Sequence, residues 1–359
     1  MKLQMTMNTT LTSTTEIYED YKDTSIDYEN YEELCVKHDV RRFAKVFLPA
    51  FYSVAFVIGI AGNSLVVAIY AYYKKIKTKT DVYLLNLAVA DLLLLFTLPF
   101  WAVDASIGWQ SGKAMCKITA ALYIINFSSG MQFLACISID RYYAVTEMSS
   151  QQNFKRRCWA VCLFVWTTSL FLSIPNLYFN EVKEHNGKHA CLAVYPKDSV
   201  KEVTAAIHIL EIVFCFIIPF TIMLFYYSAM AKVLLKTPNI KRSRSIKVLL
   251  AVVGIFLITQ LPYNITKLWR ALDIIYGLIT KCDTSRIIDL MMQVTGSMAL
   301  FHCCINPLLY AYMGTTFKSY VTKAVKKFGS RRRQRSQSVE EYAMHSDNHM
   351  EETTSSFSI

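Results

Sequence analysis

Charged residues are scarce in this sequence. Only 18% of its 359 residues are Asp, Glu, Lys or Arg, whereas 53% are hydrophobic, and the mean hydropathy is +0.28. A soluble domain carries about 25% charged residues, so the composition argues against a soluble enzyme and against a disordered, collagen-like or coiled-coil chain. The first 20 residues contain no apolar core, and we therefore expect no cleavable signal peptide.

The charges that are present lie between long apolar runs, of which only one is interrupted, by Asp91. The runs are Val46–Tyr73, Val82–Val103, Ile118–Ile139, Cys158–Asn180, Ile212–Ala231, Val248–Thr266 and Leu290–Phe317. Each supplies the about 20 residues that a helix needs to cross a bilayer, and the alternating pattern of a β-barrel is absent. The sequence predicts an all-α membrane protein, a bundle of seven transmembrane helices over residues 46–312.

Basic residues gather in the loops after the first, third and fifth runs and in the tail after the seventh. The positive-inside rule places these segments in the cytoplasm and the N-terminus outside the cell. The net charge of +11 then reflects orientation and attraction to anionic membrane lipid, and no nucleic-acid partner is expected.

The N-terminal segment, residues 1–45, is acidic. Its first 35 residues hold eight acidic residues and two lysines, a net charge of −6, together with Tyr18, Tyr21, Tyr28 and Tyr31. Such a stretch cannot fold alone. A solvated spacer is one interpretation; tyrosines among acids, suited to sulfation, favour capture of a basic protein ligand. Asn8, followed by Thr9 and Thr10, is an acceptor for N-glycosylation.

Four of the ten cysteines lie on the predicted outer, oxidising side. These four, Cys35, Cys116, Cys191 and Cys282, allow three pairings. Their spacing favours Cys116 with Cys191 and Cys35 with Cys282. Zinc binding is the alternative, but no histidine stands beside them at finger spacing, so no metal site is expected.

Asp91 is the one carboxylate inside a run, where its charge costs about 2.5–3.5 kcal/mol on insertion scales. We expect it to face the interior of the bundle and to contact Asn63, Asn306 or a bound cation in a sodium-type site. A purely structural contact between helices is the alternative.

A proline lies in each of the second, fourth, fifth, sixth and seventh runs, where it removes a backbone donor and kinks its helix. The prolines are Pro99, Pro175, Pro219, Pro262 and Pro307. A kinked bundle can be a receptor, a transporter or a channel; we see neither the paired halves of a transporter nor a polar channel lining. His302 stands alone, without the acids or serine that catalysis requires, so neither an enzyme nor a cofactor is expected.

Seven motifs in the order of the runs carry a family resemblance. They are Gly62-Asn63-Ser64-Leu65-Val66, Asn86-Leu87-Ala88-Val89-Ala90-Asp91, Asp140-Arg141-Tyr142, Trp166, Pro219, Leu261-Pro262-Tyr263-Asn264 and Asn306-Pro307-Leu308-Leu309-Tyr310. Together they resemble the rhodopsin-like G-protein-coupled receptors. The resemblance implies that a conformational switch involves Asp140, Arg141, Tyr142, Pro262, Pro307 and Tyr310.

Further residues narrow the resemblance. Thr97-Leu98-Pro99-Phe100-Trp101, the four outer cysteines and the acidic segment resemble chemokine receptors, and stretches such as Arg42–Pro49 and Ser356–Ile359 resemble the atypical, scavenging branch. That branch implies a plasma-membrane receptor that binds homeostatic CC chemokines, is phosphorylated by receptor kinases, recruits arrestins and cycles through early and recycling endosomes. The alternative is a CC chemokine receptor that signals through a heterotrimeric G protein.

The resemblance also implies a ligand pocket lined by Trp101, Tyr123 and Tyr263. Gly296 stands where the family often has a glutamate, so we expect Asp104 or Asp289 to replace that ionic anchor. Gln260 stands where many relatives have a tryptophan, a change shared with some signalling receptors.

The inner face differs from the family pattern beyond Asp140-Arg141-Tyr142, where Tyr143 and Glu147 replace leucine and histidine. We hypothesise that these two residues spoil the G-protein docking surface. Residues 313–328 predict an amphipathic helix on the inner leaflet, and residues 329–359 a disordered tail. Candidate phosphorylation sites there are Ser336, Ser338, Thr353, Thr354, Ser355 and Ser356.

Overall fold

The computed structural model describes residues 35, 37–72, 76, 78–146, 154–185, 187–236 and 240–313, with the backbone alone for 154–155, 185, 240–250, 252 and 310–313. Several predicted features therefore lie outside the described residues: the four tyrosines of the N-terminal segment, Asn8, Glu147, the amphipathic helix beyond residue 313 and the candidate phosphorylation sites.

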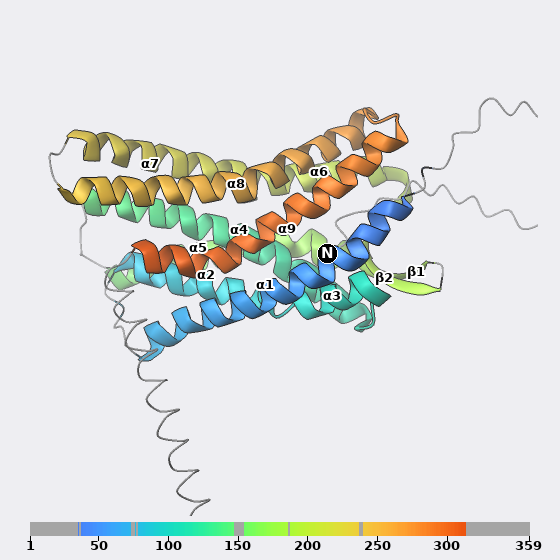
Figure 1. The fold of residues 1–359 in the computed structure, drawn as a ribbon, viewed down its shortest axis with the longest axis horizontal. Helices are drawn as coiled ribbons and strands as arrows, with labels where there is room; N and C mark the ends of the chain where they lie inside the picture. Colours follow the sequence, from blue (N-terminus) through green and yellow to red (C-terminus); the bar gives the residue numbers. More distant parts are fainter. Residues whose placement is uncertain are drawn as a thin grey trace, which may run out of the picture.

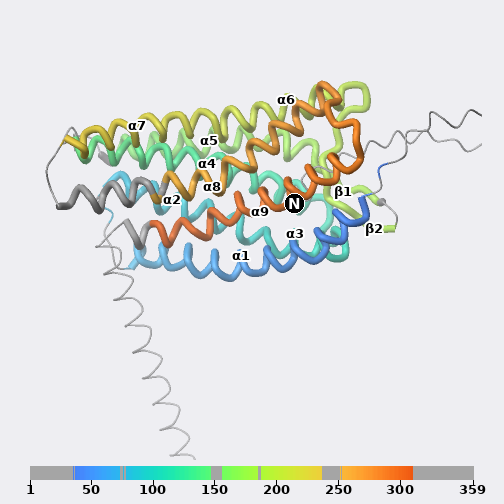
Figure 2. The backbone as a smooth tube through the Cα atoms, turned by 45° about the horizontal axis from the view of Figure 1, so that its top comes forward, coloured from blue at the N-terminus to red at the C-terminus, as the bar shows by residue number. Residues whose placement is uncertain are grey.

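Nine α-helices are formed by the described residues, and the longest of them run roughly along one common axis (Figure 1). Their bounds are α1 (His38–Tyr72), α2 (Lys79–Leu95), α3 (Leu98–Ile107), α4 (Gly112–Val145), α5 (Phe154–Phe179), α6 (Val200–Ile212), α7 (Ile218–Lys236), α8 (Ile240–Tyr276) and α9 (Cys282–Met313). The start of α1 and the junction of α8 with α9 lie at the same end of the bundle (Figure 2).

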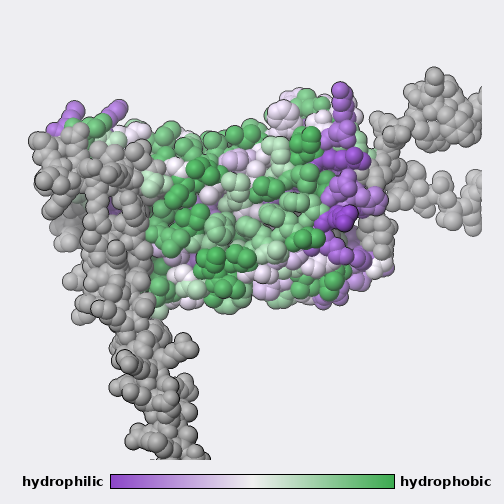
Figure 3. Space-filling model, viewed as in Figure 1, coloured by the Kyte–Doolittle hydropathy of each residue, from purple (hydrophilic) through white to green (hydrophobic). Residues whose placement is uncertain are grey.

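Six stretches of the described residues are long and apolar enough to cross a membrane: His38–Tyr72, Lys79–Ile107, Gly112–Val145, Arg156–Phe179, Lys197–Lys236 and Cys282–Leu309. The remaining predicted run, Val248–Thr266, lies within the 37 residues of α8. Hydrophobic residues cover the middle of the face shown in Figure 3, and hydrophilic residues gather at one end of it. The predicted fold class, a seven-helix membrane bundle, is confirmed.

The prolines act in two ways. Pro99 follows a break between α2 and α3, where the backbone N–H and the hydroxyl of Thr97 both donate to the carbonyl of Leu94, at 2.8 and 2.7 Å. Pro219 follows a single π-helical turn, η3 (Val213–Ile217), that joins α6 to α7. Pro175, Pro262 and Pro307 lie inside α5, α8 and α9. The break before Pro99 and the π turn before Pro219 interrupt regular α-helix, whereas α5, α8 and α9 continue through their prolines.

Helix α4 is the centre of the bundle and packs against α2, α5 and α7. Phe133, in the middle of α4, is completely buried and contacts the rings of Tyr83 and Trp166. The indole N–H of Trp166 donates to the side-chain oxygen of Asn86 at 3.0 Å, which links α5 to α2. Two of the motif residues thus hold the core together.

One end of the bundle carries both disulfides, and we call it the disulfide end. There β1 (Asn180–His185) and β2 (Lys188–Ala193) form an antiparallel hairpin in which Val182 pairs with Cys191. Cys191 is bonded to Cys116 near the start of α4, and Cys35 to Cys282 at the start of α9. Both expected pairings are present. A short helix, η2 (Lys197–Ser199), leads from the hairpin into α6.

Candidate functional site

A cavity of about 80 Å³ opens among the helices beneath the hairpin. Residues of α3, α4, α5, α6, α8 and β2 line it, including all three predicted pocket aromatics, Trp101, Tyr123 and Tyr263. The Tyr123 hydroxyl donates to the Tyr263 hydroxyl at 3.3 Å. The sequence resemblance therefore identified residues that converge in space from three separate helices.

Aromatic rings hold the base of this cavity. Phe127 lies one turn further along α4; its ring stacks on that of Tyr123, with centroids 6.3 Å apart, and meets the edge of Tyr263 at 6.1 Å. Trp101 packs against Trp109, whose indole N–H donates to the carbonyl of Gly112 at 2.8 Å. Such contacts limit rotation of the pocket side chains.

The charged feature of the cavity is an ion pair that the sequence analysis missed. Glu211 of α6 contacts Lys267 of α8, and their side chains are only 8% and 3% exposed. Asn176 of α5 donates to the other carboxylate oxygen at 3.1 Å. His208, one turn before Glu211, is also buried and lines the cavity. Three helices thus bring a carboxylate, an ammonium, an amide and an imidazole together.

Glu211 and Lys267 were not predicted, because each apolar run was taken to end at the nearest charged residue. Glu211 directly precedes the run that begins at Ile212, and Lys267 directly follows the run that ends at Thr266. In the structure α6 begins several turns before Glu211, at Val200, and α8 ends more than two turns after Lys267, at Tyr276. The apolar neighbours of Glu211 on both sides, Ile209, Leu210 and Ile212, were the signal that could have revealed its burial.

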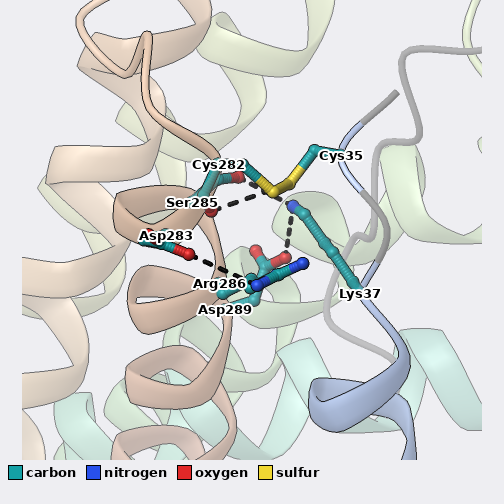
Figure 4. Close-up of a disulfide and its surroundings, with 7 residues drawn as sticks. All are labelled: Cys35, Lys37, Cys282, Asp283, Ser285, Arg286 and Asp289. Carbon is teal, nitrogen blue, oxygen red and sulfur yellow. Dashed lines mark hydrogen bonds and ion pairs between the residues drawn. A yellow bond between two sulfur atoms is a disulfide. The ribbon is translucent and has the colours of Figure 1, made fainter. Parts of the chain in front are cut away.

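The two aspartates expected to replace the missing glutamate lie elsewhere. Asp289 of α9 accepts from Lys37 at 2.6 Å, and Lys37 also donates to the Ser285 hydroxyl at 2.8 Å. This contact lies beside the Cys35–Cys282 disulfide (Figure 4). Asp104 is buried in α3. Neither aspartate is among the described residues that line the cavity.

Asp91 faces the interior of the bundle and accepts two hydrogen bonds. The side-chain amide of Asn306 donates at 2.9 Å, and that of Asn126 also at 2.9 Å. Asn63 has other partners, since its amide donates to the carbonyls of Gly59 and Cys303 at 3.1 Å. Of the two expected amide partners, the structure brings Asn306 to Asp91 and not Asn63. Asn126 takes the second place.

Three of the predicted switch residues, Asp140, Arg141 and Tyr142, lie near the end of α4, at the opposite end of the bundle from the disulfides. Asp140 accepts hydrogen bonds from both the backbone N–H and the hydroxyl of Thr80, which ties α4 to the start of α2. The ring of Tyr142 lies 5.5 Å from that of Tyr143 and 5.5 Å from that of Tyr226 on α7. Arg141 is exposed. Pro307 and Tyr310 lie on the last turns of α9, and Pro262 in α8.

The helices, disulfides and motifs described above are those of a seven-helix membrane receptor. The family described as "7 transmembrane receptor (rhodopsin family)" matches residues 62–310, well over half of the chain. Among curated proteins, "Atypical chemokine receptor 4" of Bos taurus and of Homo sapiens are 58% and 59% identical over 333 residues, which cover 93% of this chain and 94% of each relative. The human "C-C chemokine receptor type 7" is 38% identical, over 88% of this chain and 84% of that relative.

The chain therefore belongs to the chemokine receptors of the rhodopsin-like G-protein-coupled receptor family. It is a plasma-membrane receptor and not an enzyme. Its ligands are chemokines, as the family implies.

Proposed function

We propose that this chain is an atypical chemokine receptor that binds homeostatic CC chemokines and removes them from the surroundings. The observation that carries this proposal is the graded similarity: 58–59% identity to two proteins named atypical chemokine receptor 4, against 38% to a C-C chemokine receptor type 7. The 58–59% identity extends over 93% of the chain, so it covers both the disulfide end and the opposite end of the bundle.

In this proposal the N-terminus and the disulfide end face the outside of the cell. The acidic segment with Tyr18, Tyr21, Tyr28 and Tyr31 attracts the basic chemokine across a Debye length of about 8 Å. The chemokine N-terminus then enters the cavity lined by Trp101, Tyr123 and Tyr263. The two disulfides favour this order of events, because they hold the start of α1 and the hairpin at the rim of the bundle.

The fate of the complex depends on the inner side. Receptor kinases phosphorylate serines and threonines between Ser336 and Ser356, and each phosphate adds a charge of about −1.5 to −2 for arrestin to bind. Arrestin then directs the receptor into early and recycling endosomes, where the chemokine is released for degradation. Little or no G-protein signalling accompanies this cycle.

A second candidate is a G-protein-signalling CC chemokine receptor. The intact Asp140-Arg141-Tyr142 motif favours it, since the arginine that such receptors use is present and exposed. The two candidates make the same use of the ligand cavity and differ only at the opposite end.

One experiment separates them. Cells that express the receptor with an epitope at each end are given a panel of fluorescently labelled CC chemokines, and uptake, arrestin recruitment and nucleotide exchange are measured together. We expect uptake and arrestin recruitment without nucleotide exchange, and an N-terminal epitope accessible on intact cells. Robust nucleotide exchange would support the second candidate, and the absence of uptake for every chemokine would contradict the proposal.

A further inference from the structure

The ion pair between Glu211 and Lys267 stands out among the residues of the cavity. Of the described residues that line it, these two carry a full charge, and all the others are aromatic, apolar or neutral polar groups. A pair that serves only to join two helices is often replaceable by well-packed apolar side chains without loss of stability. This pair instead borders an open volume at the end of the bundle where the ligand enters.

Unused hydrogen-bonding capacity surrounds the pair. An ionised carboxylate offers about four acceptor positions; Glu211 uses one for Asn176 and one for Lys267. His208 is only 3% exposed, and its Nδ1 atom has no hydrogen-bond partner among the described residues. The site can therefore take further polar groups without breaking the contacts it already has.

Charge balance limits what those groups can be. A lone cation placed against Glu211 would leave the cluster with an excess positive charge away from water, and a lone anion against Lys267 the reverse. A ligand that brings one charge of each sign keeps the cluster neutral. In a polypeptide, the free N-terminal ammonium followed closely by an acidic side chain is such a group.

We propose that the Glu211–Lys267 pair is a subsite for a zwitterionic polypeptide N-terminus: Glu211 binds the α-ammonium, and Lys267 binds a carboxylate from one of the first few residues. Asn176 and His208 orient the carboxylate of Glu211 and add hydrogen bonds at its side. The inference rests on the proposed chemokine uptake and names the chemical feature that the cavity selects. It also explains how the pocket tolerates Gly296, because the anionic anchor stands on α6 instead of α9.

The test uses a CC chemokine that wild-type cells take up and that carries an acid among its first few residues. Three forms are compared: unmodified, N-terminally acetylated, and with that acid changed to its amide. We expect each modification to weaken uptake potency at least about tenfold in the wild type, as loss of an ionic hydrogen bond does.

The variant is Glu211→Gln combined with Lys267→Gln, which removes both charges together and so leaves no unpaired ion buried. Its potency for the unmodified chemokine should fall, and the acetylated and amide forms should then match the unmodified form. The matched control is Glu181→Gln with Lys183→Gln, which removes the exposed pair on β1, whose atoms lie 3.2 Å apart. This control should keep both penalties.

The outcomes separate the two proposals. Absence of uptake in wild-type cells contradicts the proposed function. Uptake that is insensitive to both modifications, or penalties that persist unchanged in the double variant at equal surface expression, overturns the subsite. Should the double variant fail to reach the surface, Lys267→Gln paired with Glu211→Leu provides a second variant with the same expectation.

Discussion

Gly108 lies against the backbone of His189, so that a Cβ atom on this glycine would be 2.8 Å from the His189 carbonyl oxygen. Its φ of +100° and ψ of 173° belong to a region that glycine alone adopts readily. The neighbouring Trp109 N–H donates to the same oxygen at 2.8 Å. The turn between α3 and α4 and the hairpin therefore meet without an intervening side chain.

Replacing Gly108 with alanine should destabilise the receptor by roughly 2–3 kcal/mol, since the new methyl group meets a backbone atom that cannot move freely. Gly112→Ala is the matched control: its φ is also positive, +74°, but nothing lies within 4 Å of its Cβ position, and backbone strain alone costs about 1–2 kcal/mol. Thermal unfolding of the purified receptor measures the difference. Equal midpoints for the two variants would show that the hairpin does not stay in contact with Gly108.

Asp91→Asn should lower the unfolding midpoint, because an amide donor would then oppose the donating amide of Asn306 or Asn126. The mismatch should cost about 1–3 kcal/mol. A sodium ion on this carboxylate would stabilise the wild type further. We therefore expect that replacing sodium chloride with choline chloride lowers the midpoint of the wild type and leaves that of the variant unchanged. A similar response of both proteins would argue against a cation at Asp91.

Asp289→Asn should weaken chemokine binding several-fold, since it removes the partner of Lys37 next to the disulfide that positions the N-terminal segment. The pair is partly exposed, so a loss of about 1 kcal/mol or less is expected. Asp283→Asn, which removes an exposed contact with Arg286 on the same helix, is the control and should bind normally. Equilibrium binding of a labelled CC chemokine to intact cells gives both values. Equal affinity of the two variants would contradict the anchoring role.

Tyr143→Leu combined with Glu147→His restores the residues usual in signalling relatives, and we expect a gain of agonist-dependent nucleotide exchange. The leucine removes the ring that lies 6.3 Å from Tyr226, and the histidine removes an acid from the predicted docking face. Uptake should persist, because the cavity that we propose for the ligand lies at the other end of the bundle. A double variant that still shows no nucleotide exchange would remove the hypothesis.

Much of the fold was accessible from the sequence because a bilayer imposes a simple rule on composition. The described part of each apolar run is almost wholly helical, although two of the runs span more than one helix, and the four outer cysteines formed the pairs that their spacing favoured. The breaks were harder to foresee. Pro99 lies just after a break between two helices, at which the Thr97 hydroxyl donates to the carbonyl of Leu94, whereas Pro175 leaves its helix continuous. The presence of a proline in a run does not distinguish these two outcomes.

The polar contacts were only partly predictable for a related reason. Asn63 was an expected partner of Asp91, and Asn126 was not. The rotation of each helix about its axis decides which amide reaches Asp91, and the sequence does not directly specify that rotation. In the structure Asn126 points to Asp91 and Asn63 to two backbone carbonyls. The Glu211–Lys267 pair was hidden because a rule that counts charges treats each charged residue as the end of a span.

The π-helical turn at Val213–Ile217 determines which way the side chains of the preceding helix, α6, face. One additional residue in a helix changes the azimuth of the preceding segment by about 100°. With a regular α-helical turn at this point, the carboxylate of Glu211 would be carried away from Lys267 and toward the hydrocarbon chains. A single wide turn thus directs an acid into the cavity instead of toward the lipid.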